Sequence, residues 1–265
     1  MSLLVKGRGS GREIVKVTPG MAGWRHVGFE AQRLAAGEQI EWSDTERECC
    51  IVVMTGLARV MVGDFDSGPI GGRKSVFDDA APAAVYVPNG KAASVTAVSD
   101  CEVAFASAPG RATHPVRLIR PQDMRRSVRG EGTNQRFVTD ILPADEPADS
   151  LLVVEVRTPS AHSSSYPPHK HDTDNLPSES ALEETYYHRV QPSQGFVFQR
   201  VYTDDRSLDE SNAVEDHDVV MVPRGYHPVV VPHGYESYYL NVMAGPKREW
   251  VFKNDPAHEW ILGKA

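Results

Sequence analysis

The sequence predicts an all-β protein with few short helices, built from two domains. The chain has 265 residues, a length that suits two domains of roughly 130 residues better than one large unit. Its 21 Gly and 19 Pro residues are spread along the chain and separate many short apolar runs, as turns separate strands. We expect short helices only at 121–128 and 256–262.

Short β-forming runs follow one another through the amino-terminal half. The run at 48–62 is dense in β-branched and apolar residues and is interrupted at Gly56, as in a hairpin. Between the runs, residues 64–72 and 87–90 supply the Gly, Pro, Asn and Asp of turns. This half therefore reads as one antiparallel β-domain, with strands at 27–34, 48–62, 83–87, 94–98 and 103–106.

A connector near residue 145 is expected between the two halves. Residues 142–150 (LPADEPADS) have the Pro and acidic character of a linker. We place the amino-terminal domain at 1–145 and the carboxy-terminal domain at 146–265. The second domain again consists of short runs between turn signals, at 151–157, 184–190, 195–202, 218–222, 228–231 and 238–243.

The composition excludes several classes of partner. The net charge is −8 and the Lys and Arg residues are scattered, so there is no basic stripe for nucleic acid. Residues 1–12 are polar and glycine-rich, without an apolar stretch for a signal peptide or membrane span. Cys49, Cys50 and Cys101 leave an odd count without ligand spacing, which fits reduced thiols. We expect a cytoplasmic protein with no nucleic-acid or membrane partner.

Eight of the ten histidines follow residue 160, so an imidazole-rich site belongs to the second half. YPPHKH places His169 and His171 two residues apart; on an extended chain both point the same way, and Lys170 between them points oppositely. Glu184 opens an apolar strand (ETYYHRV), and His227 follows the tight turn of PRGYH. These four residues form a predicted metal site that suits Zn²⁺, our first choice, and also Mn²⁺, Fe²⁺ or Ni²⁺.

This pattern resembles the two-part metal motif of cupins, which are jelly-roll β-barrels. The resemblance implies a bicupin with its metal site in the second barrel. A long insert (DTDNLPSESALE) separates His171 from Glu184, so Glu183 remains a rival ligand, and strand alternation lets only one glutamate face the interior. His233 is the rival to His227, but no Pro-x-Gly turn precedes it.

Longer segments resemble one family more specifically. YPPHKHDTDNLP, LEETYYHRV, GFVFQRVYTDD, VVMVPRGYHPVV and YYLNVMAG are similar to the 5-deoxy-glucuronate isomerases of inositol catabolism, which are related to 4-deoxy-5-ketouronate isomerases. The resemblance implies conversion of a small acid sugar, 5-deoxy-D-glucuronate, to 2-deoxy-5-keto-D-gluconate. Such an aldose–ketose step passes through an enediol whose charge a divalent metal stabilises, without a redox cofactor. It also implies a homo-oligomer, because cupin subunits commonly pair through exposed strands.

A general base must move the proton, and two strands offer candidate catalytic residues. If Glu184 faces inward, alternation brings Tyr186 and His188 to the same face. In 195–202 we assign the even-numbered residues to the pocket, because Arg200 and Tyr202 make theirs the more polar set. Arg200 would then grip the substrate carboxylate through two hydrogen bonds.

The amino-terminal half lacks the corresponding metal ligands. Glu48 and the turn at 88–90 fall where a cupin has its glutamate and its second turn, but no His-x-His precedes Glu48. Residues 92–94 (AAS) stand where a histidine would be required. We therefore expect a structural role for the first domain.

Two other functions remain open for such a site. His and Glu ligands on this fold also suit an Fe²⁺ dioxygenase, which would consume oxygen. A non-catalytic sugar-binding bicupin would bind its ligand and leave it unchanged. Metal identity, oxygen uptake and the fate of the bound sugar distinguish both from an isomerase.

Overall fold

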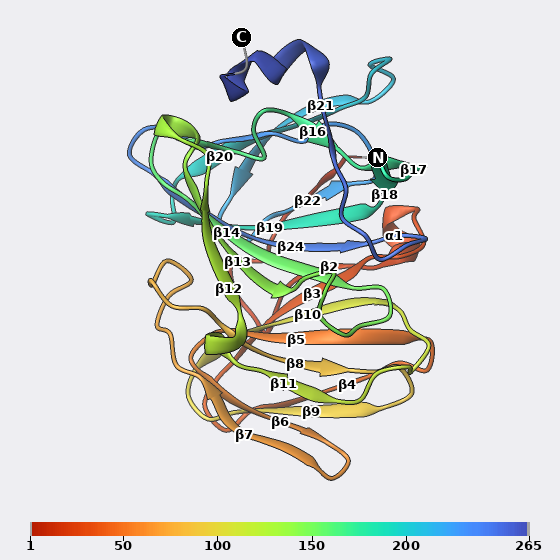
Figure 1. The fold of residues 1–265 in the computed structure, drawn as a ribbon. Coiled ribbons are helices and arrows are strands. Elements are labelled where there is room, and N and C mark those ends of the chain that lie inside the picture. The colour runs from red at the N-terminus through yellow and green to blue at the C-terminus, as the bar shows by residue number, and fades with distance from the viewer. Residues whose placement is uncertain (1, 264–265) are drawn as a thin grey trace. The chain divides into compact units, whose positions relative to one another are not determined.

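The computed structural model describes residues 2–263, which form mainly antiparallel β-sheets with a few short helical turns (Figure 1). The chain divides into two compact units. The amino-terminal unit comprises Arg8–Arg125 and Thr139–Val154. The carboxy-terminal unit comprises the described residues up to Gly7, Arg126–Val138, and those from Glu155 onward.

These units differ from the predicted domains 1–145 and 146–265. The expected connector at 142–150 lies within the amino-terminal unit, and Arg126–Val138 belongs to the carboxy-terminal unit. A single boundary near residue 145 does not describe this division, because the two strands that flank residues 143–151 each have residues in both units. The strands with residues in both units are β12 (Arg125–Arg129), β13 (Arg136–Leu142) and β14 (Leu152–Thr158).

The amino-terminal unit contains two sheets. The six-stranded sheet has the order β11-β8-β5-β10-β3-β2, and the four-stranded sheet has the order β4-β9-β6-β7. The first is made of β2 (Glu13–Val17), β3 (Gly28–Leu34), β5 (Arg47–Thr55), β8 (Ala83–Val87), β10 (Cys101–Pro109) and β11 (Arg117–Ile119). The second is made of β4 (Gln39–Ser43), β6 (Leu57–Val62), β7 (Phe65–Gly71) and β9 (Ala92–Ala97).

The core of this unit follows from the alternation of side chains along its strands. Cys49, Ile51 and Val53 of β5 are fully buried in one apolar cluster with Val60 of β6 and Val95 of β9. Period-two alternation directs one face of each strand into the space between sheets. The β-branched run predicted at 48–62 therefore supplies both a central strand and the strand that follows it.

The carboxy-terminal unit carries a seven-stranded sheet with the order β1-β22-β19-β24-β14-β13-β12 and a four-stranded sheet with the order β15-β23-β20-β21. Two small ribbons, β16-β25 and β17-β18, complete it. Besides β12 to β14, the larger sheet contains β1 (Leu4–Val5), β19 (Glu183–Gln191), β22 (Val219–Val222) and β24 (Glu236–Ala244). The other strands are β15 (Ser163–Ser164), β16 (His169–Lys170), β17 (Asp172–Asn175), β18 (Glu179–Ala181), β20 (Phe196–Tyr202), β21 (Asp209–Glu215), β23 (Val229–Val230) and β25 (Lys253–Asn254).

Helical structure is limited to short turns. Residues 256–262 form the 3₁₀ helix η3 (Pro256–Leu262), and the side chain of Asp255 caps its start. At 121–128 only η1 (Pro121–Asp123) is helical, and β12 begins at Arg125, because the charged residues there have no apolar helical face. The other helical turns of the described chain are α1 (Pro19–Ala22) and η2 (Gly132–Asn134). No helix within residues 2–263 is long and apolar enough to cross a membrane.

Candidate metal centre and active site

His169, His171 and His227 form a buried cluster in the carboxy-terminal unit. Their candidate ligand nitrogens all lie within 4.8 Å of one another. His169 begins β16, whose pairing with β25 fixes the start of the His-x-His segment. His227 follows Gly225, which has a φ of +92° and where a Cβ would lie 2.5 Å from Tyr202 O. Only glycine fits this turn, which brings the third imidazole to the other two.

Glu184 adds a carboxylate to this cluster. It lies on β19, between the neighbouring strands β22 and β24. Its Oε2 is 3.0 Å from His171 Nε2 and 3.3 Å from His227 Nε2. Glu183 is only partly buried, and adjacent side chains of a strand point to opposite faces, so Glu184 is the glutamate that faces the histidines. His233 is exposed.

Backbone carbonyls fix the protons on two of the imidazoles. His227 Nδ1 lies 2.8 Å from Gly225 O, and His171 Nδ1 lies 3.2 Å from Leu182 O. A carbonyl only accepts, so both Nδ1 atoms donate, and in the neutral rings the Nε2 lone pairs face Glu184. His227 Nε2 has no hydrogen-bond partner among the described residues. Lone pairs that face a carboxylate repel it unless a cation lies between, so this donor set fits a divalent metal.

Burial makes two of the three histidines neutral at neutral pH. It lowers the pKa of His169 to about 3, and repulsion from His171 and Arg136 adds to the effect. It lowers the pKa of His227 to about 3 as well, although the Glu184 carboxylate opposes it. Burial also acts to lower the pKa of His171, but the hydrogen bond to Glu184, the charge of that carboxylate and backbone hydrogen bonds together outweigh it, and the pKa is raised. Neutral imidazoles bind metals, so His169 and His227 are in the ligating form at neutral pH, and metal binding would displace the proton of His171.

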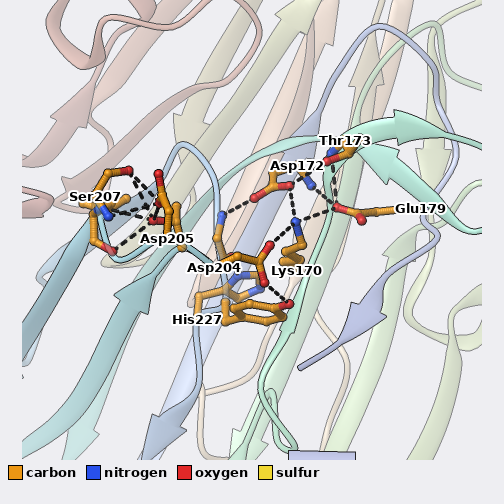
Figure 2. Close-up of polar contacts among 12 residues, drawn as sticks. Lys170, Asp172, Thr173, Glu179, Asp204, Asp205, Ser207 and His227 are labelled. Carbon is orange, nitrogen blue, oxygen red and sulfur yellow. Dashed lines mark hydrogen bonds and ion pairs between the residues drawn. The ribbon is translucent and has the colours of Figure 1, made fainter. Parts of the chain in front are cut away.

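A buried lysine connects the two segments that carry these histidines. Lys170 Nζ lies 3.0 Å from Asp172 Oδ1 and 3.0 Å from Asp204 Oδ2 (Figure 2). Asp172 Oδ2 accepts a hydrogen bond from the Gly225 backbone N–H at 2.8 Å. Asp204 Oδ1 accepts one from the Tyr226 hydroxyl, also at 2.8 Å. The ammonium therefore links the His-x-His loop to the turn before the third histidine.

A cavity of about 350 Å³ lies beside the cluster and is lined entirely by residues of the carboxy-terminal unit. His169 and Tyr186 line it, and the Tyr186 ring is 5.6 Å from the His227 ring. Tyr186 Oη is 3.0 Å from Ser165 Oγ, which is in turn 3.5 Å from Tyr239 Oη. Small-molecule sites commonly measure roughly 300 to 1,000 Å³. The cavity and the cluster together form a candidate active site.

Residues 3–261 match the model of the KduI/IolB family. The chain belongs to this family. A 5-deoxy-glucuronate isomerase from Geobacillus kaustophilus is 53% identical over 249 residues, which cover 94% of this chain and 90% of that protein. Another, from Halalkalibacterium halodurans, is 55% identical over 247 residues, covering 93% of this chain and 92% of that protein.

Solved structures agree with the membership in the KduI/IolB family. The crystal structure of an IolB-like protein from Salmonella typhimurium matches with a TM-score of 0.97 and 51% identity, covering 99% of this chain and all of that one. The oxalate decarboxylase of Lactobacillus farciminis matches with a TM-score of 0.68 and 13% identity, covering 100% of this chain and 91% of that one. The second likeness shows the fold alone, and it confirms the predicted all-β bicupin architecture.

His188 does not line the cavity of this KduI/IolB protein but lies behind Tyr186, with 6.0 Å between the ring centres. Its Nε2 is 2.8 Å from Gln199 Oε1, and Gln199 Nε2 donates to His227 O at 3.4 Å. Burial lowers the pKa of His188 to about 4, so the ring is neutral at neutral pH. His188 therefore contacts the backbone of a cluster residue through one amide.

The pocket face that alternation assigned to β20 is wrong. Val197, Gln199 and Val201 are the buried residues, while Phe198 and Arg200 are exposed. Alternation separates two faces of a strand without saying which one is inward. Here the two valines pack inside and the single inward polar residue is Gln199.

Arg200 and Tyr202 are consequently engaged away from the cluster. Both the Nε and Nη2 atoms of Arg200 donate to Asp209 at 2.7 Å, across the pairing of β20 with β21. Tyr202 is buried at the end of its strand and donates to Asp255 Oδ2 at 2.8 Å. Neither residue lines the cavity. The carboxylate-binding role predicted for Arg200 is therefore not available at its observed position.

The hydrogen bonds around the cluster also involve residues outside the predicted set, namely Ser165, Tyr239 and Gln199. Tyr239 of β24 is in register with His188 of β19. Its signal in the sequence is a hydroxyl-bearing residue two positions before Asn241, which places both side chains on the same face of the strand. Ser165 precedes the His-x-His loop, and only the three-dimensional path of that loop brings its hydroxyl to the two phenols.

In the amino-terminal unit, both oxygens of Glu48 are occupied by hydrogen bonds. Oε2 accepts from the Tyr86 hydroxyl at 2.6 Å and from the Asp149 N–H at 2.8 Å. Oε1 accepts from the N–H groups of Ser150 and Leu151 at 2.6 and 2.7 Å. The side chain has no exposed surface. This carboxylate stabilises its own unit by satisfying three backbone donors.

Proposed function

We propose that the protein is a 5-deoxy-glucuronate isomerase that interconverts 5-deoxy-D-glucuronate and 2-deoxy-5-keto-D-gluconate in inositol catabolism. Relatives that bear this name are 53% and 55% identical over more than nine-tenths of the chain. The observation that carries the proposal is the convergence of His169, His171, His227 and Glu184 beside a cavity of small-molecule size. We place the enzyme in the cytoplasm, where its three buried thiols remain reduced.

The three histidines and Glu184 would hold one divalent metal ion, and we propose Zn²⁺. The orphan Nε2 of His227 supports this assignment, as do the pKa values of His169 and His227, which burial lowers to about 3. Three imidazoles and a carboxylate are ordinary zinc ligands. When bound, the ion would stabilise the negative charge that develops on the substrate oxygens during isomerisation.

Tyr186 is our proposed proton-holding group. Tyr186 lines the cavity, and burial, followed by the charge of Glu184, raises its pKa well above the ordinary value. The phenol therefore keeps its proton and is able to donate it to a substrate oxygen at Oη. Ser165 Oγ, between the phenols of Tyr186 and Tyr239, orients both and offers a path for the proton.

His188 acts as a positioning residue in this scheme. Its hydrogen bond fixes the amide of Gln199, and that amide holds the backbone carbonyl of His227. The contact sets the position of the last metal ligand from behind. Arg200 and Tyr202 have no place in the proposed mechanism, because Asp209 and Asp255 bind their polar atoms outside the cavity.

The test is a reaction of the metal-loaded protein in deuterated water, followed by NMR. We expect conversion of 5-deoxy-D-glucuronate to the ketose at the same rate with and without oxygen. The proposed substrate is wrong if only 4-deoxy-5-ketouronate is converted. Stoichiometric oxygen consumption would instead identify a dioxygenase, and recovery of an unchanged bound sugar would identify a binding protein.

A further inference from the structure

Two arginines and no acidic residue are among the described residues that line the cavity beside the cluster. Arg129 of β12 and Arg136 of β13 contribute to its wall. No Asp or Glu occurs among the described residues that line it, although acidic residues outnumber Lys and Arg by 36 to 28 in the chain. Such a wall favours a small molecule that carries a negative charge.

Arg136 is held by neutral groups alone. Its Nη1 donates to Asn134 O at 3.1 Å and to Asn134 Oδ1 at 3.4 Å. None of the described carboxylates forms an ion pair with it, in contrast to the arginines Arg189 and Arg200, which bind Asp216 and Asp209. Burial lowers its pKa, and the charge of Arg129 lowers it further. A partly buried guanidinium keeps its positive charge, and because it has no anionic partner among the described residues, a bound anion would stabilise it.

Arg129 adds charge to the same wall. Its guanidinium lies 5.6 Å from the centre of the Trp250 ring. The ring of Trp250 is 6.3 Å from that of Phe252, which in turn is 4.6 Å from the ring of His169. This aromatic row connects the basic wall to the metal cluster along one cavity.

We propose that Arg136 binds the carboxylate of the substrate, and that Arg129 strengthens this anion site. The inference rests on the proposed function, which supplies a six-carbon acid sugar with its carboxylate and its aldehyde at opposite ends. A site for this sugar needs an anion-binding group away from the metal ligands, and Arg136 lines the same cavity as His169. The guanidinium donates two parallel hydrogen bonds to a carboxylate, which an ammonium does not match.

The experiment compares two sugars on metal-loaded enzymes. One is 5-deoxy-D-glucuronate, and the other is 5-deoxy-D-glucose, its neutral counterpart with a hydroxymethyl group in place of the carboxylate. For Arg136→Gln we expect kcat/KM for the acid to fall on the order of 10- to 100-fold, chiefly through KM, with little change for the neutral sugar. Arg136→Lys should recover part of the loss. Arg200→Gln, which removes an exposed arginine paired with Asp209, should match the wild type.

Equal losses for both sugars in Arg136→Gln, or no loss for either, would overturn the proposal. A second readout separates it from the proposed function: calorimetric binding of 5-deoxy-D-glucuronate to the metal-free protein. If the wild type converts neither sugar but binds the acid, and Arg136→Gln loses this binding while Arg200→Gln keeps it, the anion site stands and the isomerase assignment fails. If Arg136→Gln binds the acid as tightly as the wild type, the anion site itself is refuted.

Discussion

Replacing Lys170 with Met tests whether the network in Figure 2 holds the proposed metal ligands in place. The ammonium is 3.0 Å from Asp172, 3.0 Å from Asp204 and 3.8 Å from Glu179, and the lysine side chain is 10% exposed. Asp204 is 67% exposed, so its pair contributes only about 0 to 1 kcal/mol. The side chains of Asp172 and Glu179 are 12% and 6% exposed, and the substitution leaves these two carboxylates without their cation. Breaking a fully buried pair costs about 3 to 5 kcal/mol, so for this partly buried one we expect a loss of about 2 to 4 kcal/mol in unfolding free energy.

The same substitution should weaken metal binding. Asp172 accepts the backbone N–H of Gly225, two residues before His227, so a rearranged Asp172 carboxylate shifts that turn. Groups that orient metal ligands commonly change affinity by about 10- to 100-fold. We therefore expect Lys170→Met to bind Zn²⁺ about 10- to 100-fold more weakly, measured by competition with a chromogenic chelator.

Lys247 provides a matched control. Its Nζ is also 3.0 Å from a carboxylate, Asp174, but the two side chains are 53% and 42% exposed. Lys247→Met should lower the unfolding free energy by less than about 1 kcal/mol and leave Zn²⁺ affinity unchanged. A Lys170→Met protein with wild-type affinity would refute the positioning role, and equal losses in both variants would assign the effect to net charge.

Three further predictions concern separate parts of the chain. Tyr186→Phe should reduce kcat by about 10²- to 10⁴-fold at unchanged metal content; normal turnover would remove the phenol from the mechanism. Glu48→Gln should lower the unfolding free energy by about 3 kcal/mol or more, because an NH₂ group replaces an acceptor of buried donors; urea denaturation checks this, and an unperturbed midpoint would contradict it. Burial acts to raise the pKa of Asp149, but hydrogen bonds from Thr113 and two backbone N–H groups outweigh it, and the pKa is lowered. The Asp149 carboxylate therefore stabilises the folded protein at pH values above the pKa of about 3.8 that it has in the unfolded chain, and this stabilisation is lost as the pH falls through its lower pKa in the folded state. Asp149→Asn should therefore destabilise the protein at neutral pH and reduce the loss of stability between about pH 5 and about pH 3; an identical pH profile would refute it.

The cluster of His169, His171 and His227, our proposed metal ligands, could be predicted because local geometry brings these residues together. His169 and His171 are two residues apart on extended chain, and the glycine of the PRGYH turn requires a conformation that other residues rarely adopt. Alternation alone left Glu183 and Glu184 as rivals. The structure separates them because Glu184 Oε2 faces two imidazoles, a contact between segments that a one-dimensional pattern does not contain.

The prediction of the inward face was wrong for β20, where both faces of the strand carry apolar and polar residues and neither is clearly the more apolar. In β20 the even positions include Phe196 and Phe198, yet the smaller valines at 197 and 201 are the ones that pack inside. Phe198 instead lies 49% exposed. The size of the space between the sheets decides this choice, and that space depends on residues from several strands.

The two arginines that line the cavity, Arg129 and Arg136, were also not predicted as site residues. Both follow the short helix expected at 121–128, in a part of the sequence for which no strand was predicted. Hydrogen bonding places β12 and β13 at the edge of the seven-stranded sheet. Pairing between strands far apart in the sequence also explains why the units do not follow a single boundary.

The most direct test of the account is turnover of 5-deoxy-D-glucuronate measured against bound metal. Protein stripped by a chelator should be folded and inactive, and activity should rise in proportion to added Zn²⁺ up to one ion per chain. His227→Ala, which removes the imidazole whose Nε2 has no hydrogen-bond partner among residues 2–263, should bind the ion weakly and remain inactive at the same metal concentration. Full activity of the metal-free wild type, or of His227→Ala without bound metal, would contradict a metal centre at these residues.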